Sequence, residues 1–204
     1  MTQSQEMRWF ADHLQAPIGA WFARQGQTFD TVPARTDHYL VGLGREEIAP
    51  KLREGKLEIK HRVGGPRLHA LTDQARGDLE EWVKWSFALN ADDPLAQRIT
   101  NMAETDGFWM PVHKRRMGVK VAPDETGQLH PHPLSSRLDR GCQVEYTRVT
   151  LLDQTWYTFN LEWFGRPWLS VEASFFAPIL GHESLLREAS MGYGAFLQQV
   201  YAGF

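Results

Sequence analysis

The chain has 204 residues, of which 42% are hydrophobic and 23% are charged, a composition typical of a globular protein. Its 22 Lys and Arg against 25 Asp and Glu give a net charge of −3, which argues against a protein that coats nucleic acid or anionic membranes but leaves room for a local basic patch. The single cysteine, Cys142, excludes an intrachain disulfide framework. No signal-peptide pattern or membrane-length apolar stretch is present, so we expect a single cytoplasmic domain over residues 1–204.

Hydrophobic periodicity and turn residues divide the chain into predicted helices and strands. In chain order these are a helix at 6–15, a strand at 35–43, a hairpin with arms at 51–53 and 57–62, a helix at 73–89, a helix after Asp92, strands at 108–121, 142–152, 155–164 and 168–176, and a helix at 184–201. The strongest predicted helix is 73–89, because Leu79, Trp82 and Val83 follow the helical period. Three prolines and a glycine indicate a long surface loop at 123–136. Several strands with short connections, interrupted by helices, predict an α+β fold with an antiparallel sheet or barrel.

Charged residues gather on one face of the predicted strands. Basic residues outnumber acidic ones by three within 51–62, and four more basic residues lie within 114–120. Glu145, Arg148 and Glu162 lie among apolar residues in two later strands. Either these strands have one face in water, or a closed sheet points its charged face inward. In the second case the enclosed charges would require an anionic ligand, neutralising carboxylates or a cation.

Five short motifs follow one another in these strands. They are Arg-Thr-Asp-His-Tyr-Leu at 35–40, Lys-Leu-Arg-Glu-Gly-Lys-Leu-Glu-Ile-Lys-His-Arg at 51–62, Val-His-Lys-Arg-Arg at 112–116, Val-Glu at 144–145 and Asn-Leu-Glu at 160–162. Their order resembles the strand succession of the CYTH superfamily, the triphosphate tunnel metalloenzymes. The resemblance implies an eight-stranded antiparallel barrel, or tunnel, with flanking helices that binds triphosphate or another phosphorylated ligand. It also implies Mg²⁺ or Mn²⁺ as the cofactor of a hydrolytic reaction, if the chain is catalytic.

The resemblance suggests roles for individual residues. The candidate phosphate-binding residues are Lys51, Arg53, Lys60, Arg62, Lys114, Arg116 and Arg148. The candidate catalytic residues, which would also hold the metal and position water, are Glu58, Glu145 and Glu162. The expected partner is a small phosphorylated molecule, such as triphosphate, a nucleotide or an organic phosphate, with no nucleic acid and no membrane.

The chain departs from the family pattern at its start. Active members carry Glu-x-Glu-x-Lys on the first strand, where the carboxylates help to hold the metal, and this motif is absent here. The departure favours the alternative hypothesis over an enzyme. In that alternative, the chain is a non-catalytic α+β module that binds an anion or forms a homodimer, with its charged sheet face in water.

Overall fold

The computed structural model describes residues 1–42, 44–105 and 107–202, which form ten strands and four α-helices. The strands are β1 (Thr2–Ala11), β2 (Ala34–Leu40), β3 (Ile48–Arg53), β4 (Lys56–Arg62), β5 (Arg67–Thr72), β6 (Ala75–Ala88), β7 (Trp109–Pro123), β8 (Leu129–Pro133), β9 (Gly141–Leu151) and β10 (Gln154–Phe164). The helices are α1 (Ala16–Arg24), α2 (Pro94–Thr105), α3 (Ala173–Leu180) and α4 (Tyr193–Ala202), with a short 3₁₀ helix, η1 (Arg187–Ala189). Within these ranges no helix is both long and apolar enough to cross a membrane.

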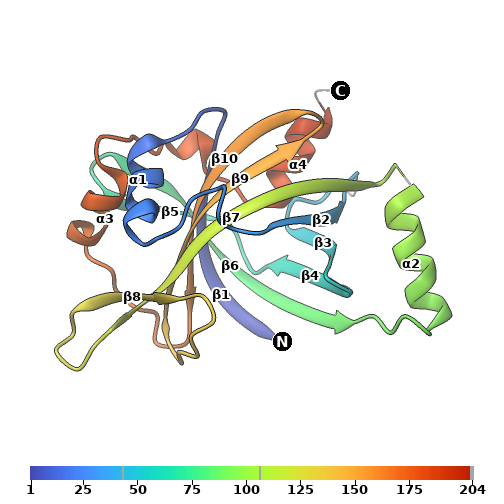
Figure 1. Ribbon diagram of the computed structural model, residues 1–204, viewed down its shortest axis with the longest axis horizontal. Helices are drawn as coiled ribbons and strands as arrows, with labels where there is room; N and C mark the ends of the chain where they lie inside the picture. The colour runs from blue at the N-terminus through green and yellow to red at the C-terminus, as the bar shows by residue number, and fades with distance from the viewer. Residues whose placement is uncertain (43, 106, 203–204) are drawn as a thin grey trace.

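Eight of the described strands close into an antiparallel barrel (Figure 1). Their order around the barrel is β1-β10-β9-β7-β2-β3-β4-β6, and pairing of β6 with β1 completes the circle. β5 pairs with the start of β6 and β8 with the end of β7, so each forms a hairpin with a barrel strand. The predicted α+β barrel with flanking helices is confirmed, and the alternative of an open sheet with a wet charged face is wrong.

The barrel places its main apolar core outside the wall, against α1 and α3. Met7, Val144 and Leu161 point outward and pack in one cluster with Phe22 of α1 and Phe176 of α3. In Figure 1 these two helices lie together on one side of the barrel. Since strand side chains alternate between faces, an outward-facing core leaves the opposite faces for the barrel interior.

A second apolar cluster fills one end of the barrel interior. Phe10, Tyr39 and Val149 lie in it on the inward faces of their strands and pack with Phe196 and Leu197 of α4. The rings of Phe10 and Phe196 stack with their centroids 3.8 Å apart. In Figure 1, α4 lies beside the ends of β9 and β10, and the N-terminus of β1 lies at the opposite side of the barrel. The interior is therefore closed by apolar packing at the end covered by α4.

The hairpin of β3 and β4 and the strands β7, β9 and β10 confirm the sequence predictions. Glu54 and Gly55, at the turn of this hairpin, have positive φ angles of 50° and 70°, as a type I′ turn requires. The helix predicted after Asp92 is also confirmed, and α2 begins at Pro94. The strand predicted at 35–43 corresponds to β2, and Leu43 lies outside the described residues.

The first two predicted helices, at 6–15 and 73–89, are wrong. Residues 6–15 belong mainly to β1, and residues 73–89 to the long strand β6. In β1 both faces are buried, because Met7 packs in the outer core while Phe10 packs in the inner cluster. Apolar residues on both faces of a strand hide the period-2 alternation and can imitate helical spacing.

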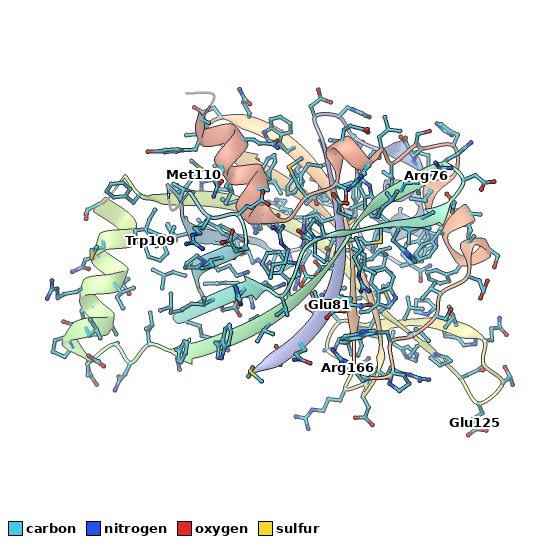
Figure 2. The ribbon with its side chains drawn as sticks, turned by 180° about the vertical axis from the view of Figure 1, so that it is seen from behind. Arg76, Glu81, Trp109, Met110, Glu125 and Arg166 are labelled. Carbon is cyan, nitrogen blue, oxygen red and sulfur yellow. The ribbon has the colours of Figure 1, made fainter. Side chains whose placement is uncertain are left out.

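Three C-terminal predictions also need correction. The strand predicted at 168–176 is an irregular segment followed by α3, and its apolar residues reflect packing on the outer core. The helix predicted at 184–201 begins only at Tyr193. A Cβ on Gly194 would lie 2.7 Å from the Glu46 carbonyl oxygen, so glycine lets the start of α4 approach the Glu46 backbone closely. The loop predicted at 123–136 contains β8, and Glu125 lies at the tip of this β7–β8 hairpin (Figure 2).

β6 passes so close to Trp9 that Gly77 has no room for a side chain. A Cβ there would lie 2.6 Å from both Trp9 Cζ2 and Ser190 Oγ. We expect Gly77→Ala to lower the free energy of unfolding by about 1–3 kcal/mol, measured by urea denaturation. Gly65→Ala is the matched control, because no atom lies within 4 Å of a Cβ at that position. Equal losses in the two variants would contradict the packing argument.

Candidate functional site

The barrel encloses a polar cavity of about 510 Å³. Nine Lys and Arg residues line it against five Glu residues, an excess of four positive charges in a chain whose net charge is −3. Strand alternation produces this arrangement. On β7, for example, Lys114 and Arg116 face the cavity, while Met117 and Val119 pack in the outer core.

Most of the residues predicted for the site meet in this cavity. The predicted phosphate-binding residues that line it are Lys51, Arg53, Lys60, Lys114 and Arg116. The three predicted catalytic residues, Glu58, Glu145 and Glu162, line it as well. Residues far apart in the sequence, from β3 to β10, thus share one enclosed space.

Two predicted phosphate-binding residues lie elsewhere. Arg148 is on the outer face of β9, where its guanidinium carbon lies 5.4 Å from the centroid of the Phe29 ring. It cannot share a face with Glu145, because residues three apart in a strand point to opposite sides. Arg62 is outside the cavity lining and forms ion pairs with Glu46 at 2.8 Å and with Glu80 at 2.6 Å. Neither side chain is available to a ligand in the cavity.

Four basic residues of the cavity were not among the candidates from the sequence: Arg8, Arg35, Lys84 and Lys120. Arg8 and Lys84 were missed because β1 and β6 were predicted as helices. A usable signal was the alternation on β1, where Ser4, Glu6 and Arg8 all face the cavity. This Ser-x-Glu-x-Arg pattern has the spacing of the family motif Glu-x-Glu-x-Lys, with serine at the first carboxylate and arginine at the lysine.

Like charges face each other across two pairs of neighbouring strands. Lys60 is directly opposite Lys84 in the pairing of β4 with β6, and Arg35 is opposite Lys114 in the pairing of β2 with β7. All four side chains line the cavity. Like charges at directly opposite positions destabilise a sheet, so an anion between them would be stabilising.

Asp37 is the buried carboxylate behind one side of the cavity. It is fully buried and accepts a hydrogen bond from Lys114 Nζ at 2.9 Å, with Lys51 Nζ at 3.5 Å and Arg35 Nε at 3.3 Å. Burial opposes its ionisation, but the attraction of Lys114, Lys51 and Arg35 holds its pKa well below the usual range. One carboxylate therefore serves three cations and leaves them with a net positive charge.

Lys114 is the most enclosed of these cations. Its Nζ also donates to Tyr39 Oη at 2.8 Å and lies 3.8 Å from the centroid of the Tyr193 ring. Burial lowers its pKa well below the usual value, and repulsion from Lys51 acts in the same direction. A bound anion would raise this pKa and favour the protonated amine.

The acidic residues of β1, β9 and β10 form a second charged group. Lys60 Nζ bonds to Glu6 Oε1 and lies 4.0 Å from Glu162 Oε1. Glu145 is paired with Arg116, and its carboxylate also accepts a hydrogen bond from Gln143 Nε2 at 2.8 Å. Burial raises the pKa of Glu162, as does repulsion from Glu6 and Glu145, while Lys60 opposes the shift.

The arrangement does not fit the predicted metal site. Glu58 is paired with Lys51 at 3.2 Å and Arg53 at 2.9 Å, while Glu145 and Glu162 are near other cations. Among the residues that the structure describes, no group of three or more His, Cys, Asp or Glu is placed to hold a metal ion. The three carboxylates predicted to share Mg²⁺ or Mn²⁺ thus act as partners of basic side chains.

The fold and the cavity together define a closed antiparallel barrel with a positively charged interior. Comparison with models of protein families found no match, and neither did a search of curated proteins. The functional conclusion therefore rests on the geometry of the cavity and on the chemistry of its side chains.

Proposed function

We propose that the chain is a divergent CYTH-like protein whose barrel binds a phosphorylated anionic ligand. The observation that carries the proposal is the excess of four positive charges in the cavity of a negatively charged chain. Lys and Arg donate charge-assisted hydrogen bonds to phosphoryl oxygens, and Arg can do so in bidentate fashion. Two like-charge pairs, Lys60 with Lys84 and Arg35 with Lys114, are offset only in part by Glu6 and Asp37, and an anion in the cavity would offset them further.

The size of the cavity supports a small ligand. A volume of about 510 Å³ can hold triphosphate, a nucleotide or an organic phosphate. The closed end beneath α4 favours a ligand that enters and leaves on one side rather than a long polymer that passes through.

The family resemblance supports the same proposal. Its motifs fall on β2, β3, β4, β7, β9 and β10, and charged residues of each face the cavity or, in the case of Asp37, lie buried directly behind it. The Ser-x-Glu-x-Arg pattern of β1 retains one carboxylate of the family's metal-binding motif. The absence of the motif's other carboxylate, together with the pairing of the remaining carboxylates with basic residues, favours binding over hydrolysis.

Thermal unfolding with inorganic triphosphate tests the proposal. We expect a ligand at 100 times its Kd to add about 2.7 kcal/mol to the free energy of unfolding, which raises the melting temperature measurably. The stabilisation should decrease as salt increases, because charged contacts carry it. Sodium chloride at matched ionic strength is the control. No shift with triphosphate, a nucleotide or an organic phosphate would contradict the proposal.

Phosphate release, assayed in the same samples, separates binding from hydrolysis. Release that requires Mg²⁺ or Mn²⁺ would identify a metal-dependent phosphohydrolase and restore the predicted role of the glutamates. Stabilisation without release would identify a binding module. Absence of binding, together with a concentration-dependent dimer in size-exclusion chromatography, would favour the dimerising alternative.

A further inference from the structure

Lys60 occupies the place between two carboxylates of neighbouring strands. Glu6 and Glu162 are directly opposite each other in the pairing of β1 with β10, so their negative charges require a nearby cation. The Lys60 ammonium bonds to Glu6 Oε1 and is 4.0 Å from Glu162 Oε1. Attraction to Glu6 and Glu162 outweighs burial and raises the pKa of Lys60. Lys60 therefore remains charged and supplies the cation that this pair needs.

The oxygen atoms around Lys60 are of the kind that hard divalent cations bind. Ser4 Oγ donates to Glu6 Oε1 at 3.0 Å, so a hydroxyl accompanies the two carboxylates. Mg²⁺ typically uses one or two carboxylates, waters and substrate phosphates as ligands. The third acidic residue, Glu145, is already bonded to Arg116 and Gln143. A divalent cation would have to displace the ammonium to reach Glu6 and Glu162.

We infer that Lys60 is a built-in counter-ion that stands in place of a divalent cation, so that the phosphorylated ligand binds to this cavity without metal. The inference rests on the proposed function for its ligand-binding test. It also has a second test, Mn²⁺ binding to the free protein, which does not depend on the ligand.

The first test measures triphosphate binding by calorimetry in the presence of EDTA. The wild-type protein should bind without metal. Lys60→Gln should weaken binding by about tenfold or more in EDTA, because a charged hydrogen-bond donor is lost, and added Mn²⁺ should restore part of the affinity by replacing the missing cation. Lys84→Gln is the matched control. It removes Lys84, the cation opposite Lys60. Lys84 has no carboxylate within ion-pair distance in the described part of the chain and attracts Glu58 and Glu162 only at longer range, so its loss of affinity should respond to Mn²⁺ much less.

The second test follows free Mn²⁺ by electron paramagnetic resonance without any phosphate. Wild-type protein should leave the Mn²⁺ signal unchanged, Lys60→Gln should reduce it, and the double variant Lys60→Gln/Glu6→Gln should restore it. Tight Mn²⁺ binding by the wild-type protein, or wild-type triphosphate binding that is lost in EDTA, would overturn the inference. These wild-type measurements decide the matter even if Lys60→Gln does not fold. Wild-type protein that binds no phosphate under any condition would refute the proposed function. The Mn²⁺ test would still show whether Lys60 takes the place of a divalent cation.

Discussion

Asp37→Asn should lower the free energy of unfolding by about 3–5 kcal/mol, because removal of one partner leaves a buried charge uncompensated. Asp37 is fully buried and lies 2.9 Å from Lys114 Nζ, with Lys51 and Arg35 also within ion-pair distance. An asparagine would keep the shape of the side chain but not its charge. Lys114 and Arg35 would then lose their counter-ion, while Lys51 would keep Glu58 at 3.2 Å, and urea denaturation at neutral pH measures the loss of stability.

The pH dependence of the stability lost in Asp37→Asn identifies the electrostatic origin of that loss. In the wild-type protein the pKa of Asp37 is lowered, so its stabilising contribution is present above the unfolded pKa and is lost as pH falls through the folded pKa. The pKa of Lys114 is also lowered, so the unfolded chain binds more protons between the two Lys114 pKa values and stability rises with pH there. Without Asp37 the pKa of Lys114 falls further. The stability of Asp37→Asn should therefore begin to rise at a lower pH than that of the wild-type protein.

Two further variants serve as controls. Asp37→Asn/Lys114→Met removes both charges and should recover part of the stability, since the uncompensated ammonium is gone. Asp78→Asn breaks a pair with Arg187 at the surface, where the Arg187 side chain is 51% exposed, and should cost at most about 1 kcal/mol. Equal losses for Asp37→Asn and Asp78→Asn would show that the cluster beside the cavity does not depend on its buried carboxylate.

The strands with one charged and one apolar face predicted an antiparallel sheet or barrel, and the family resemblance favoured the closed barrel. In the structure, five of the seven predicted cations line its cavity. The alternation of charged and apolar residues correctly predicted β4 and β10, where Lys60 and Glu162 alternate with apolar neighbours. The pattern failed for β1, which is buried on both faces, and for β6, where the adjacent residues Trp82 and Val83 are both buried, because burial on both faces hides the period-2 alternation. The wrong helix over residues 6–15 concealed Glu6 and Arg8, and with them the whole contribution of β1 to the cavity.

Arg62 and Arg148, the two cations predicted for the cavity but found outside it, were placed wrongly for different reasons. Arg148 is three residues from Glu145 on one strand, so alternation alone would have placed it on the outer face. Arg62 is two residues from Lys60, so alternation places both on the same face of β4. The sequence does not indicate that Arg62 forms ion pairs with Glu46 and Glu80. Such pairings come from elements that meet only in the folded chain. For the same reason, the sequence could not show which basic side chains pair with the glutamates of the cavity.

The wrong helix prediction over residues 6–15 concealed Arg8. Of the residues it concealed, Arg8 has the strongest expected effect on ligand binding. It lines the cavity, and its Nη1 donates to Thr158 Oγ1 at 3.3 Å, while its guanidinium carbon lies 4.7 Å from the centroid of the Tyr193 ring. Within the described part of the chain, no carboxylate lies within ion-pair distance of Arg8, unlike Lys51, Arg53 and Lys60. Most of its five N–H donors are therefore available to phosphoryl oxygens.

We expect Arg8→Gln to weaken triphosphate binding about 10- to 100-fold, since hydrogen bonds to charged groups contribute about 1.5–3 kcal/mol. The unliganded variant should keep most of its stability, because Arg8 attracts Glu6 and Glu145 but forms no ion pair with a carboxylate in the described part of the chain. Calorimetry measures the first effect and thermal unfolding without ligand measures the second. A variant that loses stability but keeps its affinity would assign Arg8 to folding alone.

Arg148→Gln is the matched control for this measurement. It makes the same substitution on the outer face of β9, where Arg148 packs on Phe29, so the affinity for triphosphate should not change. Comparing the two variants at several salt concentrations separates contact with the ligand from general attraction. Loss of a direct phosphate contact should reduce the salt dependence of binding in Arg8→Gln but not in Arg148→Gln. Equal loss of affinity in both variants would mean that long-range attraction by basic residues anywhere on the chain, rather than direct contact with the inward-facing residues of the barrel, holds the anion.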